Sequence, residues 1–263
     1  MPQLSASTLK LFQECPRCFW LHVNKKIERP RGPFPSLPSG IDRILKVYFD
    51  GYRQSARLPP LIDGQVDGRL SATSLTLGFD DASARARLWG KLDDCVILPD
   101  GRVAPLDHKT RASAPDDVSY TQRYYHFQMD VYTLLLERNG HPTVHRAYVV
   151  YYFPIEGVLH NGFPFRVAVH HIATDPQRAY ETFREGCRCL AGPLPEPGPQ
   201  CAFCRWIEVR ARQEPLADAS APPRAPSPAT WPPRPAARRA PPARRSTPSA
   251  VISTDGPADD LFA

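Results

Sequence analysis

Apolar residues recur with a helical period in four segments of the chain, and capping residues, Pro or Gly bound these segments. The clearest segment is residues 39–55, whose apolar side chains fall on one helical face: Ile41, Ile44, Leu45, Tyr48, Phe49 and Tyr52. Ser39 and Asp42 have the spacing of an N-terminal cap for this helix. The other helices are predicted over residues 5–13, 120–139 and 175–190.

A hairpin is predicted in the middle of the chain. Residues 86–98 are rich in Leu, Val and Ile, and residues 102–109 read as a second short strand. The segment between them, Pro99-Asp100-Gly101, is a turn signal. The two runs are therefore expected to pair as antiparallel strands.

Three further strand-like runs complete the predicted sheet, namely residues 70–79, 144–153 and 165–172. The first of them is expected to join the hairpin in a three-stranded unit, and the other two to extend the sheet. The order of elements predicts an α/β domain over residues 1–212, with a mixed central sheet flanked by helices.

Composition and charge narrow the class of protein. The 263-residue chain is 42% hydrophobic, enough for one sizeable core, and its net charge of +6 is compatible with a polyanionic partner or simply with solubility. No run approaches the roughly 18 apolar residues of a membrane span, and the N-terminus lacks the pattern of a signal peptide. A cytoplasmic location without membrane contact is expected, where cysteines favour metal ligands or buried thiols over disulfides.

The candidate chemistry lies on the predicted hairpin. Because side chains alternate along a strand, Asp107 and Lys109 share one face, while His108 offers only its backbone carbonyl to that face. Asp93, near the start of the partner strand, supplies a second carboxylate. Oxygen ligands and a lysine suit Mg²⁺ or Mn²⁺ and phosphodiester hydrolysis. An Asp-x-Lys triplet also occurs by chance on exposed strand edges, so the triplet alone does not establish a site.

The surroundings of this triplet follow a recognisable order: Gly90-x-x-Asp93, a hydrophobic strand, a turn, Pro105-Leu-Asp107-His-Lys109-Thr110, and Gln128-x-x-x-Tyr132 on the next helix. The combination resembles the RecB-like branch of the PD-(D/E)XK nuclease superfamily over residues 4–206. This resemblance implies a restriction-endonuclease-like core and a metal-dependent DNA nuclease, exonuclease-like and working in DNA repair or recombination.

The resemblance also implies roles for individual residues. Asp93 and Asp107 would hold Mg²⁺ or Mn²⁺, with the His108 carbonyl beside them, and Lys109 would position the attacking water or stabilise developing charge. Gln128 and Tyr132 would face single- or double-stranded DNA or orient the site. A noncatalytic nucleic-acid-binding subunit and a partner-recruiting scaffold remain alternatives that keep the same fold.

One element of the family pattern is absent. In many relatives the helix before the hairpin brings a histidine to the metal, but residues 39–55 contain no histidine. Asp42 is the nearest polar candidate for that ligand position. Its alternative role is to cap the helix.

Two C-x-x-C pairs, Cys15-Pro-Arg-Cys18 and Cys201-Ala-Phe-Cys204, lie at opposite ends of the predicted domain. Four such thiolates suit either Zn²⁺ or a [4Fe–4S] cluster, which would clip the two ends together. The first pair resembles the N-terminal part of RecB-like nucleases that carry a cysteine-bound cluster. Those nucleases usually use one early and three late cysteines. The two-plus-two arrangement here departs from that pattern and leaves zinc as an alternative to the cluster. Cys187 and Cys189 are alternative ligands, and Cys95 is expected to be a core residue.

Composition changes after residue 212. Residues 213–263 are dominated by Pro, Ala, Ser and Arg and are predicted to be a disordered tail. Its arginines would contact nucleic-acid phosphates or simply solvate a linker. Residues 255–263 faintly resemble short tails that dock on replication or single-strand-binding proteins, so a replication or repair protein is a further expected partner.

Overall fold

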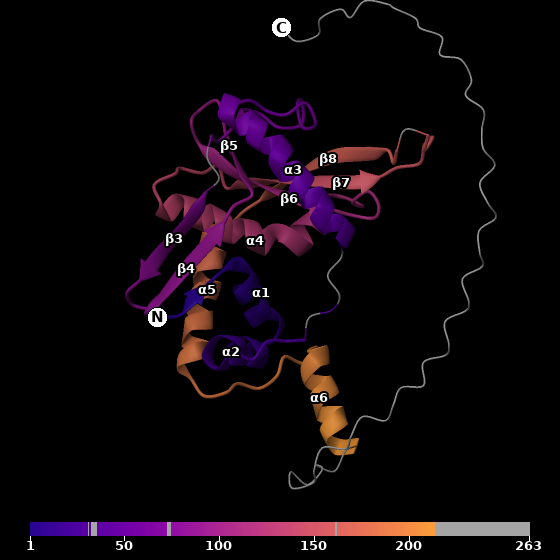
Figure 1. The fold of residues 1–263 in the computed structure, drawn as a ribbon. Coiled ribbons are helices and arrows are strands. Elements are labelled where there is room, and N and C mark those ends of the chain that lie inside the picture. The colour runs from indigo at the N-terminus through magenta and orange to yellow at the C-terminus, as the bar shows by residue number, and fades with distance from the viewer. Residues whose placement is uncertain (31, 33–35, 73–74, 161, 214–263) are drawn as a thin grey trace, which may run out of the picture. The chain divides into compact units, whose positions relative to one another are not determined.

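The computed structural model describes residues 1–213 except residues 31, 33–35, 73–74 and 161. The predictions for the tail, including its arginines and its terminal docking segment, therefore fall outside the described residues from position 214 onward. Two sheets and six helices organise the described part of the chain (Figure 1). None of its helices is both long enough and apolar enough to cross a membrane.

The larger sheet has five strands, in the order β2 (Arg69–Leu70), β5 (Asp94–Ile97), β6 (Val103–Thr110), β7 (Arg146–Pro154) and β8 (Phe165–Ala173). The predicted hairpin is present as the antiparallel pair β5–β6, and β6 then pairs with β7 in parallel. A parallel pair needs a crossover, which α4 (Val118–Arg138) provides. The sheet is therefore mixed, as predicted.

The smaller sheet has three strands, in the order β1 (Gln3–Leu4), β4 (Ala86–Lys91) and β3 (Thr76–Asp81). The predicted three-stranded unit is wrong, because the run 70–79 divides between β2 and β3 and the run 86–98 divides between β4 and β5. Lys91 pairs with Thr76 in the smaller sheet, whereas Asp94 pairs with Leu106 in the larger one. The chain thus changes sheets within two residues, at Leu92 and Asp93.

Strand β7 is buried on both faces of the larger sheet. Its side chains alternate between a cluster shared with α4 and α5 (Pro176–Ala191) and a cluster shared with α3 (Ser36–Ser55). Tyr151 belongs to the first cluster, and Tyr148 packs with Phe49 in the second. Helices therefore cover both faces (Figure 1), which explains why this strand reads as a continuous apolar run.

Helix α3 begins earlier than predicted. It starts at Ser36, so Ser39 and Asp42 lie inside the helix and neither caps it. Pro38 is tolerated there because the first turn of a helix has no backbone acceptors for its N–H groups. Leu45 and Phe49 are buried as expected, whereas Ile44 is 68% exposed.

The N-terminal helices are α1 (Ala6–Glu14) and α2 (Pro16–Lys25). Ser5 caps α1, because its hydroxyl accepts from the Thr8 N–H while the Thr8 hydroxyl accepts from the Ser5 N–H. Pro16 ends α1 and starts α2, since proline lacks only an N–H that a first helical turn does not use. Helix α6 (Ala202–Gln213) begins directly after Cys201 and contains Cys204. Periodicity predicted neither α2 nor α6.

Candidate active site and cysteine cluster

Asp107 and Lys109 lie on the same face of β6, toward α4, as the strand period predicts. The Asp107 side chain is buried, and its Oδ2 is ion-paired with Lys109 Nζ. Lys109 also lies 5.2 Å from the centre of the Tyr125 ring. The carboxylate and the ammonium group are therefore held together near the C-terminal end of β6.

Gln128 connects these residues to α4. Its Nε2 donates to Asp107 Oδ1 (2.8 Å) and to the Tyr132 hydroxyl (3.0 Å), while its Oε1 accepts from Lys109 Nζ (3.4 Å). Gln128 and Tyr132 are one helical step apart and so share this face. Gly90 of β4 leaves room for the Leu135 side chain of α4, since a Cβ there would lie 2.9 Å from Leu135 Cδ1.

Asp93 lies directly before β5 and faces the same part of β6. Its Oδ2 accepts from the His108 backbone N–H at 3.5 Å. Because the N–H and C=O of one strand residue point to the same edge, the His108 carbonyl also lies on the Asp93 side of β6. The structure thus brings together Asp93, Asp107, Lys109 and the His108 backbone, all four named from the sequence.

Burial raises the pKa of Asp107 to about 6; the Lys109 charge opposes this shift and the Asp93 charge adds to it. Two carboxylates in low dielectric repel each other unless a cation or a proton lies between them. Both carboxylates and the adjacent carbonyl are hard oxygen donors. The residues present therefore fit a divalent cation such as Mg²⁺ or Mn²⁺.

The opposite face of β6 carries a second polar group, which we call the α3-side network: Arg53, Asp94, His108 and Tyr152. Arg53 donates to both Asp94 oxygens (2.6 and 3.1 Å) and to the Asp93 backbone carbonyl (3.3 Å). The His108 ring lies 3.0 Å from Asp94 Oδ2 and, at its other nitrogen, 3.0 Å from the Tyr152 hydroxyl. The network fixes the backbone segments that present Asp93 and the His108 carbonyl.

Sequence reasoning missed Arg53 and Asp94. Both carried a signal. Arg53 follows Phe49 by four residues and therefore lies on the buried face of α3. Asp94 follows Asp93, and neighbouring residues of a strand point to opposite faces.

Asp42 forms an exposed ion pair with Lys46 (2.7 Å) on α3. Lys46 lies in a cavity of about 180 Å³ together with Asp93 and His108. The hydrogen bond to Asp42 raises the pKa of Lys46, and the charge of Asp93 contributes. Asp42 thus reaches the candidate site through Lys46, and among the described residues it forms no hydrogen bond with Asp93 or Asp107.

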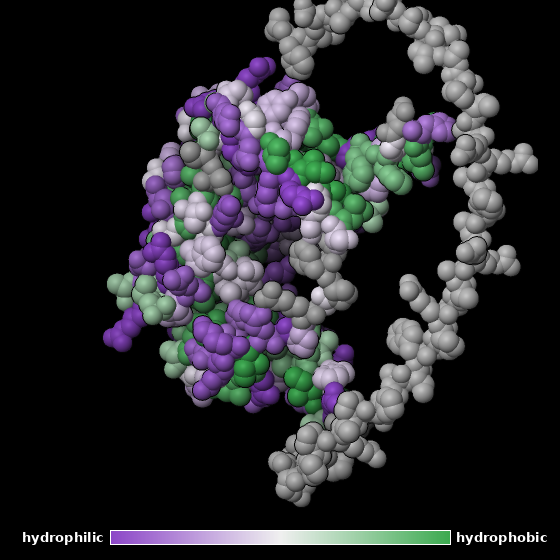
Figure 2. Space-filling model, viewed as in Figure 1, coloured by the Kyte–Doolittle hydropathy of each residue, from purple (hydrophilic) through white to green (hydrophobic). Residues whose placement is uncertain are grey.

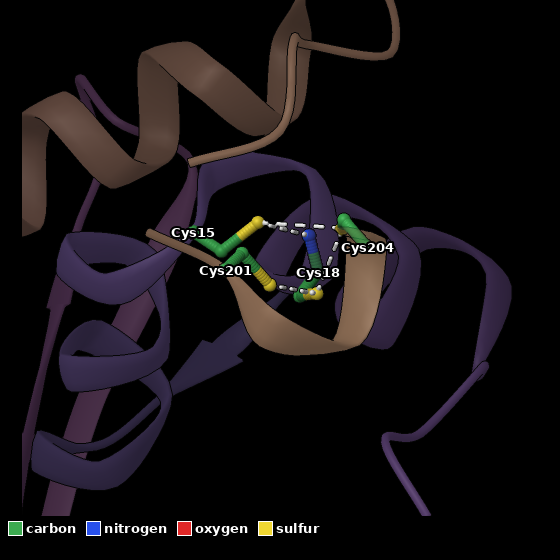
Figure 3. A group of neighbouring side chains, drawn as sticks. All are labelled: Cys15, Cys18, Cys201 and Cys204. Atoms are coloured by element: carbon green, nitrogen blue, oxygen red, sulfur yellow. Dashed lines mark hydrogen bonds between the residues drawn. The ribbon is translucent and has the colours of Figure 1, made fainter. Parts of the chain in front are cut away.

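The two cysteine pairs meet, as Figure 3 shows. Sγ of Cys204 lies 3.8 Å from that of Cys15 and 3.6 Å from that of Cys18, and Cys18 and Cys201 are 3.7 Å apart. All four sulfurs lie within 4.8 Å of one another and are buried. Cys187 and Cys189 are outside this group, and Cys95 is a core residue as expected.

Backbone N–H groups around the cluster stabilise the thiolate form of Cys15. The N–H groups of Gly198 (3.2 Å) and Cys18 (3.5 Å) donate to Cys15 Sγ and, against burial, lower the pKa of Cys15 to about 6. Gly198 is required here, because a Cβ would lie 2.4 Å from the Glu14 carbonyl oxygen. Arg29 donates to Cys201 Sγ at 3.5 Å. Burial raises the pKa of Cys18 and Cys204, so a bound cation would favour the thiolate form of these two residues.

Comparison with known proteins identifies the family of this chain. A model of the PD-(D/E)XK nuclease superfamily matches residues 53–209, more than half of the chain. No curated protein matches. The solved structure "Crystal structure of SSO0001" is similar at 13% identity, covering 81% of this chain and 87% of that one with a TM-score of 0.42. The narrower RecB-like assignment stays a prediction, and the chain belongs to the PD-(D/E)XK nuclease superfamily.

Proposed function

We propose that this protein is a metal-dependent DNA nuclease that hydrolyses phosphodiester bonds, with exonuclease-like action in DNA repair or recombination. The observation that carries the proposal is the meeting of Asp93, Asp107 and Lys109 at one end of the β5–β6 hairpin. The match to a superfamily of nucleases supports the same function. A cytoplasmic location follows as an expectation.

The carboxylates of Asp93 and Asp107, with the His108 carbonyl, would hold Mg²⁺ or Mn²⁺. When bound, such an ion supplies positive charge at the scissile phosphate and lowers the pKa of a water nucleophile. Lys109, held by Asp107 and Gln128, places an ammonium group where negative charge develops on the phosphate oxygens. Gln128 orients both Asp107 and Lys109, and Tyr132 in turn holds Gln128.

The test uses the full chain with Mn²⁺ or Mg²⁺ and DNA labelled at the 5′ or the 3′ end, offered as single strands and as duplexes. Cleavage is expected only with added divalent ion, and the labelled end that is lost first gives the polarity. Asp93→Asn and Lys109→Ala should abolish cleavage, whereas Asp100→Asn and Lys25→Ala, exposed positions outside the site, should retain it. Cleavage that persists in the first two variants overturns the assignment. Binding without cleavage by the unmodified chain supports the noncatalytic alternative.

The same proposal includes one structural zinc ion at the four cysteines. At a Zn–S distance of about 2.3 Å, the edge of a tetrahedron of sulfurs is about 3.8 Å. Three of the six sulfur–sulfur separations, 3.6, 3.7 and 3.8 Å, match that edge, and all six are within 4.8 Å. In a [4Fe–4S] cluster each thiolate binds a different iron, so the sulfurs stand farther apart than the ligands of one ion.

Metal analysis of protein purified without oxygen tests the zinc assignment. About one zinc per chain is expected, with no broad absorption near roughly 400 nm. Cys18→Ser should release the metal and lower the free energy of unfolding, because the ion clips the two ends of the domain. Cys95→Ser is the matched cysteine control, and it should keep the metal. Iron together with the visible band contradicts zinc in favour of a cluster.

A further inference from the structure

A second cavity, of about 470 Å³, lies beside the candidate active site, between the start of α1, the end of β4 and the first half of α4. We call it the α1–α4 groove. Gly90, Gln128 and Tyr132 lie in it, and Lys91 lines both this groove and the smaller cavity that holds Asp93. The groove therefore runs up to the carboxylates. The face in Figure 2 is hollowed between its α3 and α1 parts, and hydrophilic side chains gather there.

The groove is positively charged. Lys10, Lys91 and Arg123 line it, and all three are exposed. None of them forms an ion pair with a described residue, and none of the described residues lining the groove is acidic. The small neighbouring cavity differs, because Asp50, Asp93 and Asp94 lie in it. A polyanion placed in the groove would meet three exposed cations along its length and, among the described residues, carboxylates only at its end.

The groove also carries exposed aromatic rings. Trp89 on β4 is 39% exposed and Tyr124 on α4 is 51% exposed. The Tyr124 ring is supported by Tyr120, whose centroid lies 4.5 Å away. Exposed aromatic rings among cations are the features with which proteins bind single-stranded nucleic acid, since unpaired bases stack on the rings while phosphates contact the cations. In a duplex the base faces are already stacked on one another and cannot reach such rings.

We propose that the α1–α4 groove binds a single strand of nucleic acid, with bases stacked on Trp89 and Tyr124 and phosphates on Lys10 and Arg123. This inference rests on the proposed nuclease function, in which the bound strand runs along the groove, past Lys91 and Gln128, to Asp93 and Asp107. It names the substrate class as a single strand or a single-stranded end. Duplex DNA would have to be opened before it could occupy the groove.

Binding can be measured apart from cleavage. The full chain is titrated into fluorescein-labelled single-stranded DNA, blunt duplex DNA and single-stranded RNA without added Mg²⁺ or Mn²⁺, and fluorescence anisotropy gives Kd. Single-stranded DNA should bind at least about tenfold more tightly than the duplex. Trp89→Ala and Tyr124→Ala should each weaken single-strand binding by roughly tenfold. Lys10→Gln should lower the slope of log K against log salt by about 0.7.

The matched controls are Trp206→Ala and Arg57→Gln, an exposed aromatic and an exposed cation outside the groove. Both should bind as the unmodified chain does. Trp89→Phe should restore most of the affinity that Trp89→Ala loses, and equal melting temperatures exclude misfolding. Equal affinity for RNA means that the groove accepts either sugar, and weaker RNA binding means that it selects DNA.

The two proposals fail separately. If the duplex binds as tightly as the single strand, or if Trp89→Ala and Tyr124→Ala keep the original Kd, the groove is not the binding site, whether or not the protein cleaves DNA. If the groove variants lose single-strand binding but no divalent ion supports cleavage by the unmodified chain, the groove stands and the nuclease function falls.

Discussion

Asp107 and His108 are neighbours on β6, yet their side chains meet opposite surroundings. Toward α4, Asp107, Lys109 and Gln128 gather beside the Asp93 carboxylate, whose one hydrogen bond to a described residue is the long contact from the His108 N–H. Toward α3, Asp94 accepts two hydrogen bonds from Arg53 and one from His108. On the α4 side, few donors compensate the negative charge of the carboxylates. On the α3 side, hydrogen bonds from Arg53 and His108 compensate nearly all the charge of Asp94.

We infer from this difference that the α4 side is the proposed metal site and that the α3 side holds the fold. Asp93 and Asp94 have the same chemistry and adjacent positions, so their roles are set by which face of the sheet they reach. Substitutions on the α4 side should therefore change activity more than stability. Substitutions on the α3 side should change stability first.

The largest expected effect is that of Asp107→Asn on cleavage. This change keeps the shape and the bond from Gln128 but removes the charge that would hold the metal and pair with Lys109, so the cleavage rate should fall by roughly 10³-fold or more. The free energy of unfolding in urea should not fall, because a buried carboxylate is replaced by a neutral amide. A loss of stability comparable to that of a core substitution would contradict the assignment of activity to the α4 side and stability to the α3 side.

Asp94→Ala should be the most destabilising change on the α3 side. It removes the bidentate partner of the buried Arg53, which keeps its ion pair with Asp50 and its bond to the Asp93 carbonyl, so the free energy of unfolding should fall by about 3 kcal/mol. Asp93→Ala, at a half-buried position without an ion pair to a described residue, is the matched comparison and should cost far less. Urea titrations of the two variants measure the difference. Equal losses would show that both aspartates hold the fold.

The pH dependence of stability should report Asp107. Its pKa is raised to about 6 in the folded protein, so between about pH 4 and pH 6 the folded state binds more protons at this site than the unfolded state. The free energy of unfolding should therefore decrease as pH rises through this window, by no more than about 3 kcal/mol from this group. Subtracting the profile of Asp107→Asn isolates the contribution. A flat difference profile would contradict the burial of a titrating Asp107.

The smallest expected effect is that of Tyr152→Phe. The change removes one hydroxyl, 3.0 Å from His108 Nδ1, and should cost about 1 kcal/mol of stability. Cleavage should be unchanged, because the bonds of Arg53 to Asp94 and to the Asp93 carbonyl remain. Thermal melting and initial rates of the same preparation check both parts. A large loss of cleavage would extend the active site to the α3 side.

Much of the candidate site was predictable because its pattern is local. The alternation of strand side chains placed Asp107 and Lys109 on one face, and the helical step placed Gln128 beside Tyr132. Arg53 and Asp94 were missed because their importance depends on each other, and they lie 41 positions apart in the chain. The position of Asp42 in the sequence predicts either a helix cap or a metal ligand, whereas the structure pairs its carboxylate with Lys46.

The sequence by itself determined the periods of the elements, the face that each side chain takes within its strand or helix, and the thiols available as ligands, since these follow from local backbone geometry and residue chemistry. Only the tertiary structure decided that the run 86–98 belongs to two sheets and that Cys15 and Cys18 meet Cys201 and Cys204. Sheet membership and convergence depend on hydrogen bonds and packing between distant segments. A period of two residues is the same whichever sheet the strand joins.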